Sequence, residues 1–166
     1  MRFGVTAGFA LAGFVGLAGC MPQPKNPTEF RAAVREGGFM TRVEEKTVAR
    51  GFDSAFGIVS RNSDRCLNTV THSSTPGTYG PETSSLYFKA TVTPKGPQAG
   101  EVAVQMNAPN MVGDYPEGGV YILVADVEKV NEGSAKVTVY AAGKGGDIVQ
   151  SVLDWADGKG DACPDL

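Results

Sequence analysis

The sequence has few of the residues on which catalytic and metal sites depend. Its 166 residues include one histidine and three cysteines. A zinc site needs several Cys or His ligands at paired spacings, which this set does not provide. The histidine, His72, lies beside serines, but no Gly-x-Ser-x-Gly motif surrounds any serine of the chain. We therefore expect an exposed, structural His72 in a protein that is not an enzyme and holds no cofactor or metal.

Positive charge is also in short supply. The chain has 15 Lys and Arg residues against 18 Asp and Glu, which gives a formal net charge of -3. Proteins bind the phosphates of DNA and RNA through clustered Lys and Arg side chains, so nucleic acid is not an expected partner. The hydrophobic share of 42% is ordinary for a globular domain. This composition excludes a disordered polyelectrolyte and a membrane protein with many spans.

The acidic residues near the C-terminus do not follow a calcium-binding pattern. A calcium loop places Asp or Asn at alternating positions. The run Asp157-Gly158-Lys159-Gly160-Asp161 has lysine at the third position, where a ligand would stand. We interpret these residues as solvated acids that follow a helix.

A long apolar run occurs only near the start of the chain. Residues 3–19 carry no charge and follow Arg2. The run is shorter than the roughly 20 apolar residues that a bilayer-spanning helix needs. A basic start, a short apolar middle and small residues at the end are typical of a secretory signal peptide. The alternative is an N-terminal membrane anchor that is never cleaved.

The signal ends in Leu17-Ala18-Gly19-Cys20. This run resembles the lipobox of bacterial lipoproteins, in which Leu and two small residues precede an invariant cysteine. The resemblance implies that residues 1–19 are removed and that Cys20 becomes a lipid-bearing N-terminus, which anchors the protein to a membrane through several acyl chains. The next residue is Met21 rather than Asp, which by resemblance to enteric lipoproteins favours the outer membrane.

The compartment that this anchor implies bears on the rest of the chain. Residues 20–28 are rich in proline and predict a tether, and residues 29–166 predict a single periplasmic domain. The periplasm is oxidising, so we expect Cys66 and Cys163 to form a disulfide. The alternative is two separate buried thiols.

Hydrophobic periodicity predicts an α+β fold. A short helix is expected from Pro27 to Gly37-Gly38, where Asn26 would be the N-cap. The remaining patterns predict an antiparallel sheet of five to six strands with two amphipathic helices packed on one face, their ends joined by the disulfide. Asp147 is expected to cap the second of these helices. The helices are expected at 52–66 and 148–157, the strands at 39–48, 67–73, 86–93, 101–107, 120–130 and 135–141, and a loop at 74–83.

Two loops are candidates for binding a partner. One spans residues 75–81 and contains Tyr79, and the other spans residues 108–119 and contains Met111 and Tyr115. Functional residues concentrate on long loops of small domains. The alternative for the second loop is a wide β-hairpin connection that packs on its own sheet.

These patterns lead to two functional hypotheses. The first is a non-catalytic lipoprotein of the cell envelope whose periplasmic domain binds a protein partner or supports envelope assembly. The second is a carrier of a small ligand or lipid, with a cavity between the sheet and its helices. Such a cavity would be lined by Phe52, Phe56, Val152 and Trp155, although apolar stripes of this kind usually form a core.

Overall fold

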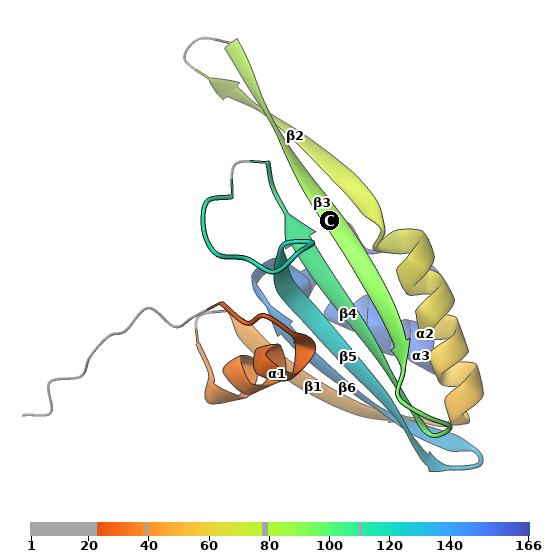
Figure 1. Cartoon of the computed structure of the whole chain (residues 1–166). Helices are drawn as coiled ribbons and strands as arrows, with labels where there is room; N and C mark the ends of the chain where they lie inside the picture. Colours follow the sequence, from red (N-terminus) through yellow and green to blue (C-terminus); the bar gives the residue numbers. More distant parts are fainter. Residues whose placement is uncertain (1–22, 39, 78–79, 110) are drawn as a thin grey trace, which may run out of the picture.

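A computed structural model describes residues 23–166 of the chain, with the exception of residues 39, 78–79 and 110. The predicted signal peptide and Cys20 lie outside these residues. The described chain folds as an α+β domain (Figure 1). Its elements are α1 (Pro27–Glu36), β1 (Thr41–Val48), α2 (Phe52–Cys66), β2 (Thr69–Gly77), β3 (Gly80–Pro94), β4 (Ala99–Asn107), β5 (Val120–Asn131), β6 (Ser134–Ala142), the 3₁₀ helix η1 (Gly143–Asp147) and α3 (Val149–Asp157).

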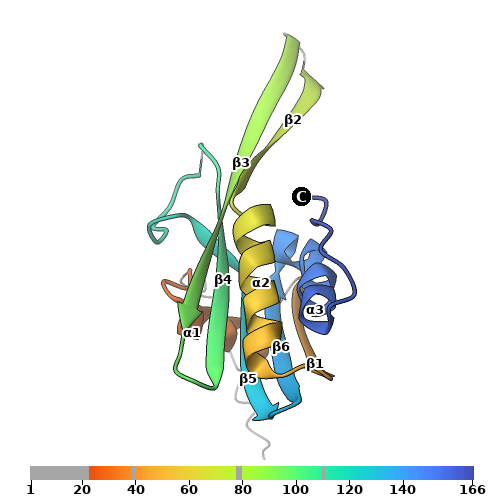
Figure 2. The same ribbon diagram turned by 90° about the vertical axis from the view of Figure 1, so that its right-hand side faces the viewer.

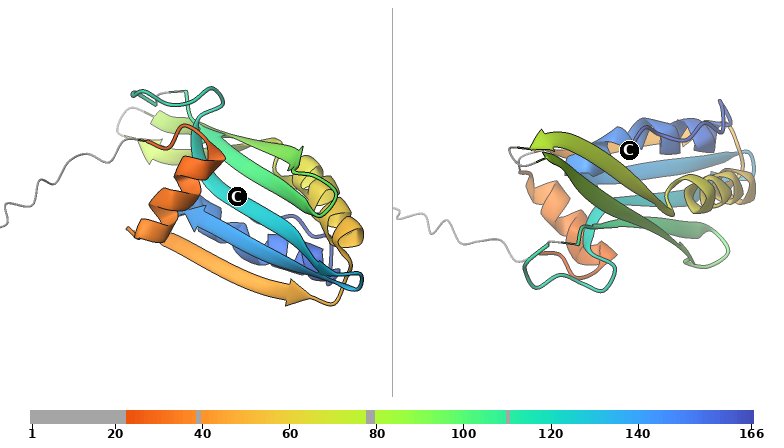
Figure 3. Two further views of the ribbon diagram at one scale, coloured as in Figure 1. Left: turned by 60° about the horizontal axis from the view of Figure 1, so that its bottom comes forward. Right: turned by 90° about the horizontal axis from the view of Figure 1, so that it is seen from above.

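The strands form one antiparallel sheet of six in the order β1-β6-β5-β4-β3-β2. From β2 to β6 each strand pairs with the next along the chain, and β1 pairs with β6, so that β1 and β2 are the two edge strands. The sheet is twisted and curled (Figure 3). These observations confirm the predicted fold class and the predicted antiparallel sheet.

Helices lie on both faces of the sheet. Helices α2 and α3 pack against each other and against one face, and α1 packs against the opposite face (Figure 2). Strand β5 therefore buries side chains in both directions: Leu123 faces the α2–α3 layer and Val124 faces α1. A strand that is covered on both faces has a continuous apolar sequence instead of an alternating one, which explains the long apolar run at 120–130.

Helix α1 begins as its sequence predicts. The side chain of Asn26 accepts a hydrogen bond from the backbone N–H of Glu29 at 2.9 Å, and Pro27 is the first helical residue. This N-cap satisfies one of the backbone donors that the first turn leaves free. Phe30 and Val34 are buried on the face of α1 that packs on the sheet.

The disulfide between Cys66 and Cys163 is present, and the two Cα atoms are 5.2 Å apart. Cys66 is the last residue of α2, as expected. Cys163 is not at the end of α3, because that helix ends at Asp157 with Gly158 in the left-handed conformation (φ 69°). The bridge therefore joins the end of α2 to the tail that follows α3, which corrects the expected junction of two helix ends.

The loop predicted at 74–83 is wrong, because most of this segment continues the strands. Strand β2 runs to Gly77 and β3 starts at Gly80, with Pro76 directly opposite Pro81. Proline is excluded from the middle of a sheet because it has no N–H for the ladder. Here the two strands extend beyond β4, so each proline can direct its nitrogen toward a free edge.

Asp147 does not cap α3. It ends η1, and its carboxylate is 3.7 Å from the ammonium of Lys144, while the N-cap position of α3 belongs to Ile148, which makes no side-chain capping bond. The glycine-rich run Gly143–Asp147 allows η1 to lie against β5. A Cβ atom at Gly145 would be only 1.8 Å from the carbonyl oxygen of Ile122, so only glycine fits there.

Candidate functional site

Part of the β2–β3 hairpin projects beyond the sheet. Strand β3 pairs with β4 only from Tyr87 onward, so residues 80–86 pair with β2 alone. We call residues 71–77 and 80–86 the arm. The arm extends away from the helices and from the end of β4 (Figures 1 and 2).

The described side chains of the arm are mostly polar and exposed. His72 Nδ1 is hydrogen-bonded to Ser85 Oγ at 2.9 Å, and the hydroxyl groups of Ser73 and Ser84 are 2.6 Å apart. Both contacts join residues directly opposite each other on the two strands. Cross-strand pairs of this kind stabilise a hairpin. His72 is exposed, as expected, and its hydrogen bond belongs to this ladder.

The base of the arm carries an apolar pair. Val70 and Tyr87 lie opposite each other on β2 and β3. Their side chains remain 40% and 46% exposed, respectively. Large apolar side chains that stay exposed in a group are a mark of interaction surfaces.

The connection between β4 and β5, residues 108–119, is held to β4 at its returning end. The buried amide of Gln105 donates hydrogen bonds to the carbonyl oxygens of Glu117 and Gly119, at 2.9 and 3.0 Å. Gly119 has φ 99°, and a Cβ atom there would be 2.2 Å from the carbonyl oxygen of Met106. Gln105 is not among the residues that the sequence singles out, although a polar residue inside the apolar strand at 101–107 is a usable signal.

The predicted binding residues of this loop also hold it together. The backbone N–H of Met111 donates to the carbonyl oxygen of Ala108 at 3.0 Å, and the Tyr115 hydroxyl donates to the carbonyl oxygen of Val112 at 3.0 Å. Met111 and Tyr115 are half-buried, whereas Val112 is 91% exposed. Tyr79, the predicted binding residue of the other loop, lies outside the described residues.

The arm and this loop border a common cleft. Residues 83–86 of β3 and residues 108–109 line a hollow of about 310 Å³. Figure 1 shows the loop beside the lower part of the arm. The structure thus brings strand β3 of the arm beside the predicted binding loop at 108–119. The other predicted binding loop, 75–81, does not line this hollow, and its described residues belong to strands β2 and β3.

One edge of β3 is open beside this cleft. The backbone N–H of Ala90 donates to the side chain of Asn68 at 2.8 Å, on the β2 side of the strand. Because successive residues of a strand direct their peptide groups to opposite sides, those of Ser85 and Thr83 are directed away from β2. Strand β4 ends at Asn107, so the described chain provides no strand to pair with Ser85 and Thr83 on that side. An extended segment of another protein could bind such an edge.

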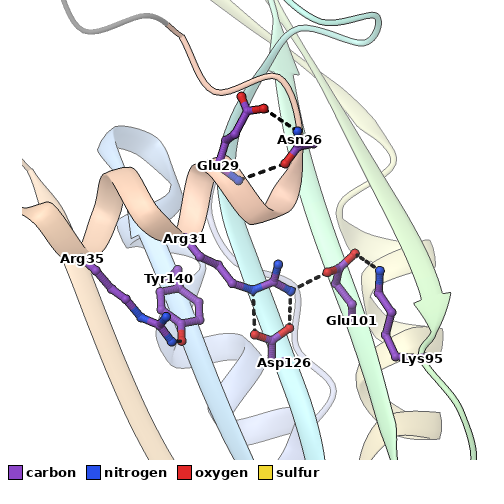
Figure 4. Close-up of polar contacts among 8 residues, drawn as sticks. All are labelled: Asn26, Glu29, Arg31, Arg35, Lys95, Glu101, Asp126 and Tyr140. Atoms are coloured by element: carbon purple, nitrogen blue, oxygen red, sulfur yellow. Dashed lines mark hydrogen bonds and ion pairs between the residues drawn. The ribbon is translucent and has the colours of Figure 1, made fainter.

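Apart from the arm and its cleft, a cluster of charged side chains lies between α1 and the sheet (Figure 4). The guanidinium of Arg31 forms a bidentate pair with Asp126, with Nε 2.7 Å from Oδ2, and also contacts Glu101. Lys95 approaches Glu101 at 3.2 Å. Burial disfavours the charged guanidinium, but the hydrogen bonds to Asp126 and Glu101 outweigh it and raise the pKa of Arg31. The cluster pairs each positive charge with a carboxylate and holds α1 on the sheet.

Two tyrosines complete the surroundings of this cluster. The guanidinium of Arg35 lies 4.9 Å from the ring centroid of Tyr140, which is a cation–π geometry. Burial and the negative charge of Glu101 raise the pKa of Tyr121. The sequence does not reveal the contacts of Arg31, because this residue and its carboxylate partners are 70 and 95 residues apart in the chain.

The acidic residues near the C-terminus pair with cations of the chain. The carboxylate of Asp157 is 2.9 Å from the ammonium of Lys159 and 3.0 Å from that of Lys46, and these hydrogen bonds lower the pKa of Asp157. Asp161 lies 3.8 Å from Arg65. Within the described residues, no three His, Cys, Asp or Glu side chains are grouped as metal ligands would be.

The four side chains that a carrier would use pack as core residues. Phe52, Val152 and Trp155 are buried in the cluster between the sheet and the α2–α3 layer. Phe56 is partly buried and stacks on Phe52 with the ring centroids 5.5 Å apart.

No family model matches this chain, and no curated protein is significantly similar to it in sequence. Among the residues that the structure describes, no helix combines the length and the apolar character needed to cross a bilayer. The function is therefore inferred from the residues and from their geometry.

Proposed function

We propose that this chain is a non-catalytic lipoprotein of the bacterial cell envelope, anchored through lipids on Cys20, that binds a protein partner with the arm and its cleft. The domain faces the periplasm, and the outer membrane is the proposed site of anchoring. The apolar run at 3–19 and the lipobox-like Leu17-Ala18-Gly19-Cys20 support the anchor. The Cys66–Cys163 disulfide is consistent with an oxidising compartment.

The observation that carries partner binding is the open edge of β3 beside the cleft. Thr83 and Ser85 offer peptide groups to a partner segment there, and the exposed Val70–Tyr87 pair adds apolar area at the base of the arm. Main-chain hydrogen bonds and side-chain contacts of this kind are how proteins bind an extended segment at a sheet edge. The residues that would line a carrier's cavity serve in the core instead, which favours a protein partner over a small ligand.

Photo-crosslinking in intact cells tests this proposal. A photoreactive amino acid replaces Thr83 on the arm in one variant and Tyr87 at its base in another. The matched control replaces Val130, which is 55% exposed and lies next to the β5–β6 turn, at the opposite end of the sheet (Figure 1). We expect one shared crosslinked protein from Thr83 and Tyr87 that Val130 does not capture. Identical products from all three positions would contradict the proposal.

A further inference from the structure

The segment that precedes α1 contacts the 108–119 loop. The ammonium of Lys25 is 2.7 Å from the carboxylate of Asp114 and also donates to the carbonyl oxygen of Asp114. Lys25 belongs to the short stretch between the proposed anchor and the first helix. In Figure 1 the start of the described chain, drawn in red, runs close to this loop. The loop is therefore beside the point from which the domain is tethered.

The length of the tether limits how far this loop can be from the bilayer. Five peptide units separate Cys20 from Lys25, and a fully extended chain spans at most about 3.6 Å per residue, or about 18 Å in all. This limit holds for any conformation of the tether. The headgroup region extends the bilayer by roughly 5–7 Å beyond the hydrocarbon core on each side. An acylated Cys20 would thus keep the Lys25–Asp114 contact close to the lipid headgroups.

The chemistry of the loop suits a lipid surface. Val112 is 91% exposed, and the half-buried Met111 and Tyr115 lie on either side of it in the sequence. Apolar side chains with a neighbouring tyrosine are common where proteins meet the membrane interface. Asp114 is paired with Lys25, which reduces the negative charge that this part of the loop presents.

We propose that residues 111–116 contact the surface of the bilayer that holds Cys20, and that Val112 enters the headgroup region. This inference rests on the proposed lipid anchor. One exposed valine provides too little apolar area to bind a membrane alone, but the anchor makes the contact intramolecular and thereby raises its effective concentration. Glu117 is also exposed, and its negative charge would be repelled by acidic headgroups. We therefore expect the contact to form without acidic lipids.

The test uses the mature lipidated protein, which begins at Cys20, in vesicles of phosphatidylethanolamine and phosphatidylcholine. An environment-sensitive fluorophore is attached at Val112→Cys in one sample and at Val130→Cys in the control; both positions are exposed valines. We expect the emission at position 112 to shift to shorter wavelength and to lose its quenching by aqueous iodide. Position 130 should keep the emission and the quenching of a fully hydrated probe. The same hydrated signal at both positions would overturn the inference.

Two further measurements separate this inference from the proposed function. Flotation of the vesicles in a density gradient reports the anchor: a protein that does not float shows that the lipoprotein proposal itself fails. A protein that floats while position 112 stays hydrated shows that only the loop contact fails. If position 112 becomes protected only after an envelope protein extract is added, the loop binds a protein and the inference is wrong.

A tether variant tests whether the contact depends on the anchor. A flexible insertion of about 20 Gly and Ser residues between Pro22 and Gln23 lowers the effective concentration of the loop at the bilayer. We expect this variant to float as before and to lose much of the emission shift at position 112. A full shift in the variant would contradict an intramolecular contact.

Discussion

Arg31 shows how a single side chain attaches the first helix to the domain. Its guanidinium contacts both Asp126 and Glu101, whose side chains are only 22% and 5% exposed. Removing one partner of a buried ion pair costs more than the pair itself contributes, because the remaining charges lose their compensation. The apolar contacts of Phe30 and Val34 would have to hold α1 without it.

We predict that Arg31→Met destabilises the protein by about 2–4 kcal/mol, because it leaves the poorly solvated carboxylate of Asp126 unpaired and leaves Glu101 with Lys95 as its remaining cation. Urea unfolding measures the loss, and hydrogen exchange should show faster exchange in α1 than in the rest of the fold. The control is Arg42→Met, which removes an exposed arginine that contacts Glu44. Exposed pairs contribute about 0–1 kcal/mol, so this variant should unfold near the wild-type midpoint. Equal midpoints for both variants would contradict the role of Arg31.

Contacts between residues that are close in the sequence could be predicted, whereas contacts between residues that are distant in the sequence could not. Asn26 could be identified as the N-cap of α1 because the capping side chain and the backbone N–H of Glu29, from which it accepts, are only three residues apart. Gln105 was missed because its partners lie in a loop whose path follows from the whole sheet. Asp147 was misassigned because Gly143–Asp147 forms a 3₁₀ turn against β5, so the start of α3 moves one residue along.

At the scale of elements, the disulfide and the Asp157 contacts hold the C-terminal tail and α3. The bridge fixes the tail to the end of α2, and the indole N–H of Trp155 donates to the carbonyl oxygen of Ala162 at 3.0 Å. Asp157, the last residue of α3, pairs with Lys46 of β1 across the domain. The disulfide therefore ties α2 to the C-terminal tail, and the Asp157–Lys46 pair ties α3 to β1.

Replacing both cysteines by serine should lower stability by up to about 4–5 kcal/mol, since the bridge closes a loop of nearly a hundred residues in the unfolded chain. Oxidised wild type and the double variant are compared by urea unfolding. The tail beyond Gly158 should also lose protection from hydrogen exchange. Should the double variant unfold at the wild-type midpoint, the disulfide would have no stabilising role.

The pKa shift of Asp157 gives a pH dependence with a defined sign. Lys159 and Lys46 lower the pKa of Asp157 below its usual 3.8. The charged carboxylate therefore stabilises the fold above about pH 4, and this contribution is lost as the pH falls through the lowered pKa. Asp157→Asn should be less stable than wild type near pH 7, and the difference should shrink near pH 3, as measured by urea midpoints. A difference that grows on acidification would contradict this assignment.

The control for that experiment is Asp161→Asn. Asp161 is 83% exposed and lies 3.8 Å from Arg65, a longer and more solvated contact than those of Asp157. We expect its midpoints to follow wild type at both pH values, because such surface pairs contribute little.

The elements themselves followed well from sequence, with one informative exception. Helix α2 and the β5–β6 hairpin agree with their predicted ranges because their periodicity is strong and their turns are local. The 74–83 loop was predicted from its prolines and glycines, which usually interrupt strands. Those residues are tolerated because the arm is only two strands wide. A local sequence pattern does not show how many strands a sheet has at a given position.

On the scale of the whole molecule, the tether of the proposed anchor and the proposed binding surface both adjoin the 108–119 loop. The tether contacts the 108–119 loop through Lys25, and the same loop borders the cleft beside the arm. A partner bound at the arm would therefore be close to the membrane that carries Cys20. The sequence pattern predicted a binding loop at 108–119, but only the folded sheet places this loop beside the arm.

The central claim is the anchored lipoprotein, and mass spectrometry of the N-terminal peptide from membranes of producing bacteria tests it most directly. The account predicts a mature chain that begins at Cys20 and carries the mass of a diacylglyceryl group and an additional acyl chain. Cys20→Ala should keep residues 1–19 and lose the lipid. A wild-type chain that keeps its first 19 residues, or is cleaved elsewhere and carries an unmodified Cys20, would contradict the account.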